Sequence, residues 1–220
     1  MNVRASAGGS RCWVLVPAFD EEARVADVVR VARAAEVGPV LVIDDGSRDA
    51  TARVAEAAGA RVLRLPRNVG KGGALAEGAA SCDAEVLVLL DADLTGLRPA
   101  HVRALAGPVL DGEADMTRGV FAGARLRTTA AQRLAPQLGG QRGVRRELLQ
   151  GVAGLRQSRY GVEMRLAEAA RSGGWRVRDV RLAGVSQVMK EEKLGWWRGL
   201  GARMGMYRDI VRAWWAGGRT

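Results

Sequence analysis

Val86-Leu87-Val88-Leu89-Leu90-Asp91-Ala92-Asp93 decides the fold of this chain, because an apolar run of strand length ends there in two carboxylates. Helix-period stretches separate this run from three earlier ones; in the stretch 21–35 the valines fall on one face and the arginines elsewhere. Nearly all-apolar strands that alternate with helices predict an α/β fold with a mainly parallel sheet flanked by helices. The earlier runs are Cys12–Val16, Val40–Ile43 and Arg61–Leu65.

Local signals refine this pattern. Ser47 or Asp49 can cap the helix that follows the second strand, and Gly59 can end it. After Asp115 the pattern is less regular, with a helix expected near 162–171 and a strand near 175–180.

Length and composition limit the class of protein. The 220 residues suit one domain, 1–220, and no apolar run approaches the 18 residues of a membrane span. The polar start lacks a signal-peptide core, and two cysteines, Cys12 and Cys82, are too few for a disulfide framework. We therefore expect a cytoplasmic protein, and the single histidine, His101, argues against His-based triads and His-rich metal sites.

The net charge of +10 is unevenly distributed. Residues 1–115 carry 13 Lys+Arg against 17 Asp+Glu, whereas residues 116–220 carry 21 against 7. The basic second half leaves nucleic acid, a membrane surface and a phosphorylated substrate open as partners. Only three of the basic residues are lysines, and each of them can mark a site that needs a compact ammonium group.

Acidic residues follow three of the predicted strands. Because ligands of parallel α/β sheets bind beyond the carboxyl ends of the strands, these loops form the candidate site. Asp91 and Asp93 suit a divalent cation that also takes oxygens from a diphosphate, although an Asp after a strand is often only a helix cap. Three acidic loops at one edge would repel one another unless a cation or hydrogen-bond donors were present. The other two loops are 17–22 and 44–47.

The loop Arg67-Asn68-Val69-Gly70-Lys71-Gly72-Gly73 adds a cation. Its glycines allow close backbone approach, and Lys71 can meet phosphate oxygens or a base carbonyl. The loop is not a Walker A motif, since no Ser or Thr follows the lysine, and no GxGxxG follows the first strand.

Four motifs in this order resemble the nucleotide-sugar half of a GT-A (Rossmann-like) glycosyltransferase of family 2: VPAFDEEARVADVV, VLVIDDGSRDAT, LPRNVGKGGAL and VLVLLDADL. The resemblance implies transfer from a UDP- or GDP-sugar with Mg²⁺ or Mn²⁺, and it makes Asp93 the direct metal ligand, with Asp91 nearer the ribose or sugar. Phe19-Asp20 replaces the usual Tyr-Asn. The nucleotide-sugar contacts it implies are Pro17, Ala18, Asp20, Glu21, Asp44, Asp45, Lys71, Asp91 and Ala92.

Charge and helical spacing, together with the resemblance, divide the chain into a nucleotide-sugar half (12–115), an acceptor half (116–193) and a C-terminal amphipathic helix (194–220). In the acceptor half, Gly140-Gln141-Arg142 and Tyr160-Gly161-Val162-Glu163 are similar to the acceptor region of bacterial family 2 enzymes and glucosyl-3-phosphoglycerate synthases. Arg142, Tyr160 and Glu163 are thus expected at the acceptor, with Asp91, Asp93 and Glu163 as catalytic residues.

Each of these residues also has a structural interpretation. Arg142, Arg145 and Arg146 can form forks for phosphate or a solvated helix face. Glu163 can bind substrate or act as a helix cap. A phosphate acceptor needs no general base, whereas inverting transfer to a hydroxyl needs a carboxylate, and only Glu163 stands out for that role. We therefore expect a phosphate-bearing acceptor, either polyprenyl phosphate or a small phosphorylated acid.

Related enzymes often carry a further metal-binding histidine near the end of the catalytic domain. The matching stretch here is Gly184-Val185-Ser186-Gln187-Val188, in which Gln187 can take that place through its amide oxygen. We expect His101 at the surface. Lys190-Glu191-Glu192-Lys193 can form a lid over the diphosphate or ion pairs on a solvated turn.

The last stretch, 196–215, has tryptophans and arginines at helical spacing. Such a helix can lie in a membrane interface at the inner face, which suits a lipid-linked acceptor, or it can pack on the catalytic domain. Two alternatives remain: a retaining glucosyl-3-phosphoglycerate synthase-like enzyme, and a noncatalytic protein that binds nucleic acid or membrane. Because the aromatic residues are too clustered for base stacking, no nucleic-acid partner is expected. The oligomeric state stays open.

Overall fold

The computed structural model describes residues 10–122, 140–159 and 161–187. They form one seven-stranded sheet, in the order β3-β2-β1-β4-β7-β6-β8, and a two-stranded sheet of β5 and β9. β7 alone runs antiparallel to its neighbours in the larger sheet, so the predicted α/β fold with a mainly parallel sheet is confirmed. The strands are β1 (Cys12–Ala18), β2 (Val40–Asp44), β3 (Arg61–Arg64), β4 (Val86–Leu89), β5 (Leu94–Thr95), β6 (Met116–Ala122), β7 (Arg142–Arg145), β8 (Val177–Ala183) and β9 (Ser186–Gln187).

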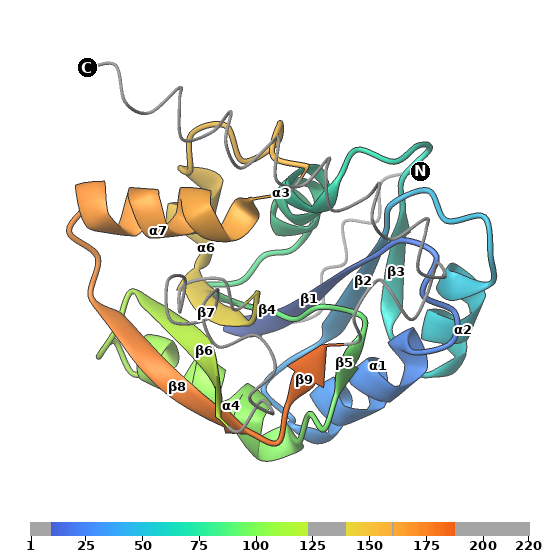
Figure 1. Cartoon of the computed structure of the whole chain (residues 1–220), viewed down its shortest axis with the longest axis horizontal. Helices are drawn as coiled ribbons and strands as arrows, with labels where there is room; N and C mark the ends of the chain where they lie inside the picture. The colour runs from blue at the N-terminus through green and yellow to red at the C-terminus, as the bar shows by residue number, and fades with distance from the viewer. Residues whose placement is uncertain (1–9, 123–139, 160, 188–220) are drawn as a thin grey trace.

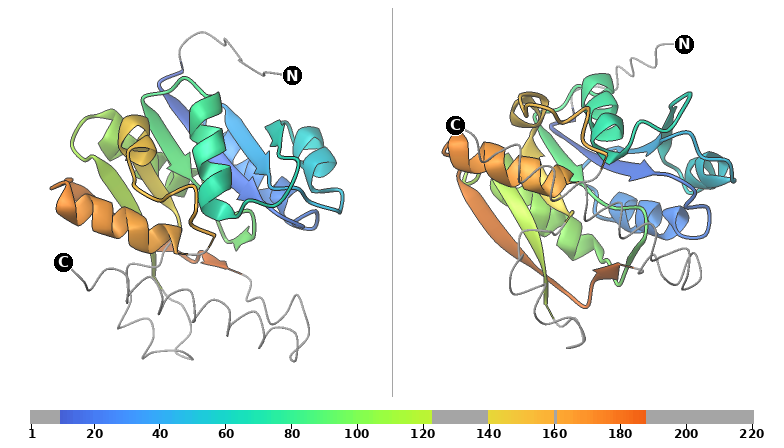
Figure 2. Two further views of the ribbon diagram at one scale, coloured as in Figure 1. Left: turned by 90° about the horizontal axis from the view of Figure 1, so that it is seen from above. Right: turned by 45° about the horizontal axis from the view of Figure 1, so that its top comes forward.

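Helices cover both faces of the large sheet. α1, α2 and α4 pack on one face, and α3, α6 and α7 lie over the other (Figure 1). The right-hand view in Figure 2 shows β8, the orange strand, at the outer edge of the sheet, beyond β6. The helices are α1 (Val25–Ala34), α2 (Thr51–Ala57), α3 (Lys71–Ser81), α4 (Pro99–Leu110), α6 (Arg146–Gln150) and α7 (Val162–Ser172).

Two apolar cores follow from this layering. Successive residues of a strand point to opposite faces, so Val14 and Val16 of β1 enter the core under α1 and α4, while Trp13 and Leu15 enter the core under α3, α6 and α7. The strands are apolar throughout because both of their faces are buried.

The predicted strands agree with the observed ones to within two residues at the ends of the first four. The first helix begins at Val25 rather than Glu21, because the amides of Glu21 and Glu22 bond to the hydroxyl of Thr51 (2.8 Å) and the carboxylate of Asp49 (3.1 Å). Asp49 also accepts the amide of Thr51, the first residue of α2. Gly59 follows this helix with φ of 92°, as expected for a residue that ends a helix.

The expectation for His101 is wrong, and the expected boundary at residue 115 is not tested. His101 is 9% exposed, not a surface residue, because its Nδ1 accepts the amide of Arg98 (3.2 Å) within the first turn of α4. Burial, together with the nearby Arg98 charge, lowers the pKa of this imidazole. The division of the chain at residue 115 stays a prediction. Strands from both sides of that residue, β4 and β7, pair within one sheet.

The C-terminal amphipathic helix of 194–220, the stretch 190–193 and Tyr160 lie outside the described residues. Within the described part of the chain, no helix is both long and apolar enough to cross a membrane.

Candidate functional site

The carboxyl ends of β1, β2 and β4 meet at one edge of the sheet. Ala18 is paired with Asp44 across β1 and β2, and β4 ends two residues before Asp91. Pro17, Ala18 and the acidic loops are thereby brought together, as the strand pattern predicted.

Backbone amides, rather than a cation alone, hold the first two acidic loops together. Asp20 accepts the amide of Arg48 at 2.8 Å, and Asp44 accepts the amide of Ser47 at 3.0 Å. Asp20 has a φ of 54°, a left-handed conformation that Asn and Asp adopt more readily than other side chains. The expected repulsion between the β1 and β2 loops is therefore offset by hydrogen-bond donors.

Asp45 has a related role. It is 4% exposed, and its two carboxylate oxygens accept the amides of Val69 (2.7 Å) and Gly70 (2.9 Å). This carboxylate fixes the loop that leads into α3 and so places Lys71. A direct contact between Asp45 and the nucleotide sugar remains a prediction.

The glycines of this loop admit another part of the chain. A Cβ on Gly72 would lie 2.1 Å from the carbonyl oxygen of Leu155, and the Gly72 amide donates to the carbonyl of Ser158 at 2.9 Å. The close backbone approach that the sequence predicted is therefore made by the segment 155–159.

Lys71 is the centre of the site. Its ammonium lies 2.7 Å from Asp91 Oδ1 and 2.6 Å from Glu163 Oε1, and Gln141 Nε2 donates to Asp91 Oδ2 at 2.9 Å. We call Lys71, Asp91, Gln141 and Glu163 the Lys71 cluster. It joins α3, the end of β4, the segment before β7 and the first turn of α7, which lie far apart in the sequence.

The electrostatics of this cluster favour the charged forms. Burial alone would raise the pKa of Glu163, but Lys71 outweighs it and holds that pKa below its ordinary value. Burial would lower the pKa of Lys71, whereas Asp91 and Glu163 together raise it. The ammonium and the Glu163 carboxylate are therefore both charged near neutral pH.

The three arginines singled out in the sequence lie at opposite ends of β7, with Arg142 at its start and Arg145 and Arg146 at its end. Arg142 is paired with Leu89, near Asp91, whereas Arg145 is paired with Val86 at the opposite end of β4. Arg145 and Arg146 line a cavity of about 490 Å³ at that opposite edge, away from the Lys71 cluster.

Arg142 itself is 1% exposed. Its Nη1 lies 3.7 Å from the Met116 sulfur and its Nη2 lies 3.5 Å from the Glu163 carbonyl. Burial lowers the pKa of this guanidinium to about 10. The guanidinium faces the interior beside Glu163, so its contact with an acceptor stays a prediction.

The remaining metal candidates are close in the fold. The backbone of β9 pairs Gln187 with Leu94 of β5, the residue that follows Asp93. Asp93 is more exposed than Asp91, both of whose oxygens are engaged within the Lys71 cluster. Within the described residues, no group of three or more His, Cys, Asp or Glu side chains forms a metal site. A hard cation at Asp93 would therefore have to take most of its ligands from water and a diphosphate, and Gln187 as a further ligand stays a prediction.

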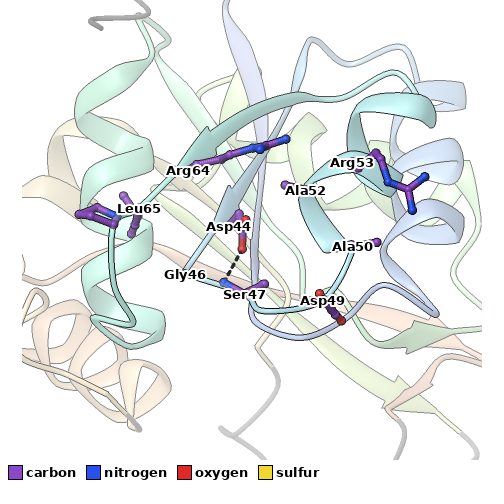
Figure 3. Close-up of a pocket in the computed structure, with 10 residues that line it drawn as sticks. Asp44, Gly46, Ser47, Asp49, Ala50, Ala52, Arg53, Arg64 and Leu65 are labelled. Atoms are coloured by element: carbon purple, nitrogen blue, oxygen red, sulfur yellow. Dashed lines mark hydrogen bonds between the residues drawn. The ribbon is translucent and has the colours of Figure 1, made fainter.

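A cavity of about 390 Å³ lies beside the end of β2, between α2 and the end of β3. Figure 3 shows Asp44 with its hydrogen bond to Ser47, and Arg53 and Arg64 on the surrounding elements. Its size is within the range of small-molecule sites.

A family model described as "Glycosyl transferase family 2" matches residues 13–155. The chain belongs to this family. The matched residues include all four acidic and glycine-rich motifs of the candidate site. The match confirms the family that these motifs indicated.

The similar proteins of known name include a glucosyl-3-phosphoglycerate synthase of Mycobacterium tuberculosis, 32% identical over 202 residues, which cover 74% of this chain and 62% of that protein. An undecaprenyl-phosphate 4-deoxy-4-formamido-L-arabinose transferase of Pseudomonas fluorescens is 32% identical over 92 residues, 37% of this chain and 27% of that protein. The chain thus spans about 62% of the length of the mycobacterial relative.

Solved structures agree on the fold. The M. tuberculosis glucosyl-3-phosphoglycerate synthase in complex with Mn²⁺, UDP and glucosyl-3-phosphoglycerate has a TM-score of 0.68 at 28% identity, covering 82% of this chain and 72% of that one. The same enzyme with Mn²⁺, UDP and phosphoglyceric acid has a TM-score of 0.73 at 28% identity, covering 92% and 76%. The predicted GT-A fold is confirmed.

Sequence reasoning missed Gln141. It lies within the Gly140-Gln141-Arg142 motif, but nothing in the sequence shows that it faces Asp91. The only local signal was its position beside a glycine just before a strand.

Proposed function

We propose that this family 2 protein transfers a sugar from a nucleotide diphosphate sugar, a UDP- or GDP-sugar, to an acceptor that carries phosphate. The observation that carries the proposal is the contact of Lys71 with Asp91, two residues before Asp93, at the carboxyl edge of the sheet. A relative whose solved complex holds Mn²⁺, UDP and glucosyl-3-phosphoglycerate supports it.

Asp93, with Gln187 as a further proposed ligand on the strand that pairs with Leu94, would hold Mg²⁺ or Mn²⁺ together with the donor diphosphate. When bound, such a cation neutralises charge that develops on the leaving diphosphate. The cavity beside Asp44 is the place we propose for the nucleoside. Pro17 and Ala18 pair with the last two residues of β2, next to this cavity but outside its lining.

The chain's own groups then orient the reactants. Lys71 holds the carboxylates of Asp91 and Glu163 in fixed positions, which limits the reorganisation needed when the donor binds. A carboxylate whose pKa is lowered is a weak base, so Glu163 suits substrate binding better than proton abstraction. This favours an acceptor phosphate, which needs no base, over an acceptor hydroxyl in an inverting reaction.

A thermal-shift titration tests the proposal. UDP- and GDP-sugars are each added with and without Mn²⁺, and a ligand at 100 times its Kd is expected to stabilise by about 2.7 kcal/mol. Asp93→Ala should abolish the part of the shift that depends on Mn²⁺, whereas Asp111→Ala, a change at the end of α4, should not. The absence of any response to either nucleotide class would contradict the proposal.

A second candidate is a retaining enzyme that glucosylates a small phosphorylated acid, favoured by the similarity to the M. tuberculosis enzyme. The anomeric configuration of the product, measured by NMR, separates it from an inverting transferase. Polyprenyl phosphate is the other acceptor, for which we propose peripheral contact of 196–215 with anionic lipid. Co-sedimentation of the full chain with vesicles containing anionic lipid measures that contact; a protein that stays in the supernatant at low salt would contradict it.

A further inference from the structure

Gln141 lies inside the protein without a full set of hydrogen-bond partners. It is 0% exposed, and its Nε2 donates to Asp91 Oδ2, but its Oε1 is buried with no partner in the part of the chain that the structure describes. A buried amide oxygen without a donor is destabilising, and an apolar side chain would avoid that cost. A glutamine at this position therefore needs a reason other than stability.

Gly140 is constrained by the same carboxylate. A Cβ on Gly140 would lie 2.5 Å from Asp91 Oδ2 and 2.8 Å from Lys71 Nζ. The strand register explains this closeness, because β7 pairs Arg142 with Leu89 in the antiparallel sense, and extending it by two residues brings Gly140 opposite Asp91. Any side chain at position 140 would enter the space in which Lys71 and Asp91 meet.

We infer that Gln141 is a positioning residue for Asp91 and that Gly140 keeps open the space for the Asp91–Lys71 contact. The amide of Gln141 fixes one carboxylate oxygen as Lys71 fixes the other, so the plane of the Asp91 carboxylate is set from both sides. Because the amide is neutral, it orients Asp91 without cancelling its charge, as a second cation at position 141 would. The consequence for sugar transfer rests on the proposed function, whereas the geometry of the cluster does not.

The lysine content of the chain provides a direct measurement. With only three lysines, a ¹⁵N-lysine-labelled sample gives at most three side-chain ammonium signals, and loss of one signal in Lys71→Arg assigns Lys71. In Gln141→Met, a similar-sized side chain with no donor, we expect hydrogen exchange of the Lys71 ammonium to accelerate about tenfold. Gln150→Met is the matched control, because Gln150 donates to the Ala79 carbonyl outside the site.

Gly140→Ala is expected to accelerate the same exchange, and Gly107→Ala is its control, since a Cβ on Gly107 would meet nothing within 4 Å. If Gln141→Met does not fold, Gln141→Asn serves instead, because it keeps an amide but withdraws it from Asp91. Unchanged Lys71 exchange in a folded Gln141 variant would overturn the inference, whether or not the protein transfers sugar.

Kinetics provide the second measurement once transfer is observed. We expect Gln141→Met to lower kcat/KM for the donor about tenfold or more, the usual effect of removing a group that orients a site residue. The KM of the acceptor should stay unchanged, since Gln141 acts through Asp91. An equal rise in both KM values, as a general loss of structure would cause, would overturn the assignment.

Discussion

Removing the Lys71 ammonium is expected to destabilise the fold strongly at neutral pH and much less at acidic pH. Lys71 lies 2.7 Å from Asp91 Oδ1 and 2.6 Å from Glu163 Oε1, so these two oxygens are no more than 5.3 Å apart. Without the cation, their repulsion at an effective dielectric constant of about 20 is about 3 kcal/mol. This agrees with the usual cost of breaking a buried ion pair from one side. We therefore expect Lys71→Met to lower the free energy of unfolding by about 3 kcal/mol at pH 7.5.

The pH dependence identifies the cause. In the natural protein the pKa of Glu163 is below its ordinary value of 4.5, so its stabilising effect is present above about pH 4.5 and is lost as the pH falls through the lowered pKa. In Lys71→Met the nearby Asp91 charge is no longer offset, and its repulsion instead raises the pKa of Glu163. Protonation of one carboxylate costs about 4 kcal/mol at pH 7.5 but almost nothing near pH 4.5, where it removes the repulsion. The difference between the two proteins should therefore shrink as the pH falls.

Urea unfolding at pH 7.5 and pH 4.5, followed by circular dichroism, measures the effect. Arg30→Met is the control, because the Arg30–Asp27 pair (2.8 Å) is exposed on α1 and its removal should cost less than about 0.5 kcal/mol. A loss below about 1 kcal/mol at pH 7.5, or an equal loss at both pH values, would refute this electrostatic account.

Three further predictions concern the residues around this site and the frame of the sheet. Asp45→Ala should lower the free energy of unfolding by about 1–2 kcal/mol in urea titrations, because two backbone amides before α3 lose their acceptor. Gly72→Ala should cost about 1–3 kcal/mol in the same assay, since its methyl group would lie 2.1 Å from the Leu155 carbonyl oxygen; unchanged stability would show that this loop is not held by that contact. Asp115→Asn should raise the midpoint pH of acid unfolding, because hydrogen bonds from Arg176 lower the pKa of Asp115 to about 2, and its stabilising effect is kept until the pH falls to that value.

The strands and the acidic edge were predictable because their signals are local. An apolar run that ends in Asp marks both a buried strand and the edge at which it ends, and Asp44 and Asp91 lie where this rule places them. The bounds of α1 were less predictable, since its first turn is replaced by hydrogen bonds to a loop 28 to 30 residues away.

The Lys71 cluster could not be predicted in the same way. Its contacts depend on β7 running antiparallel to β4, which brings Gln141 beside Asp91 and turns Arg145 toward the opposite edge. The residues of a single strand do not show in which direction it runs in the sheet. When one strand of a mainly parallel sheet is antiparallel, the opposite end of its motif reaches the site. For the same reason the three arginines of one short motif, which looked alike in the sequence, have different surroundings in the fold.

Charged side chains of the two halves form ion pairs with each other, which the sequence alone did not show. Many of the second-half arginines in the described residues pair with first-half carboxylates, so the acidic and basic halves complement each other across the sheet. These pairs are Arg145–Asp115, Arg146–Asp83, Arg156–Glu77, Arg176–Asp115 and Arg178–Glu113.

Most of these pairs are partly exposed, so each contributes little to stability by itself, but together they use charge that would otherwise be available to an anionic partner. Asp115 shows the effect most clearly, because it receives two arginines and lies at the proposed boundary between the halves. Within the part of the second half that the structure describes, the number of arginines is therefore a poor measure of affinity for phosphate. A phosphate-bearing acceptor would instead be recognised by the groups near Asp91 and Glu163, and among Arg142, Arg145 and Arg146 only Arg142 lies close to them.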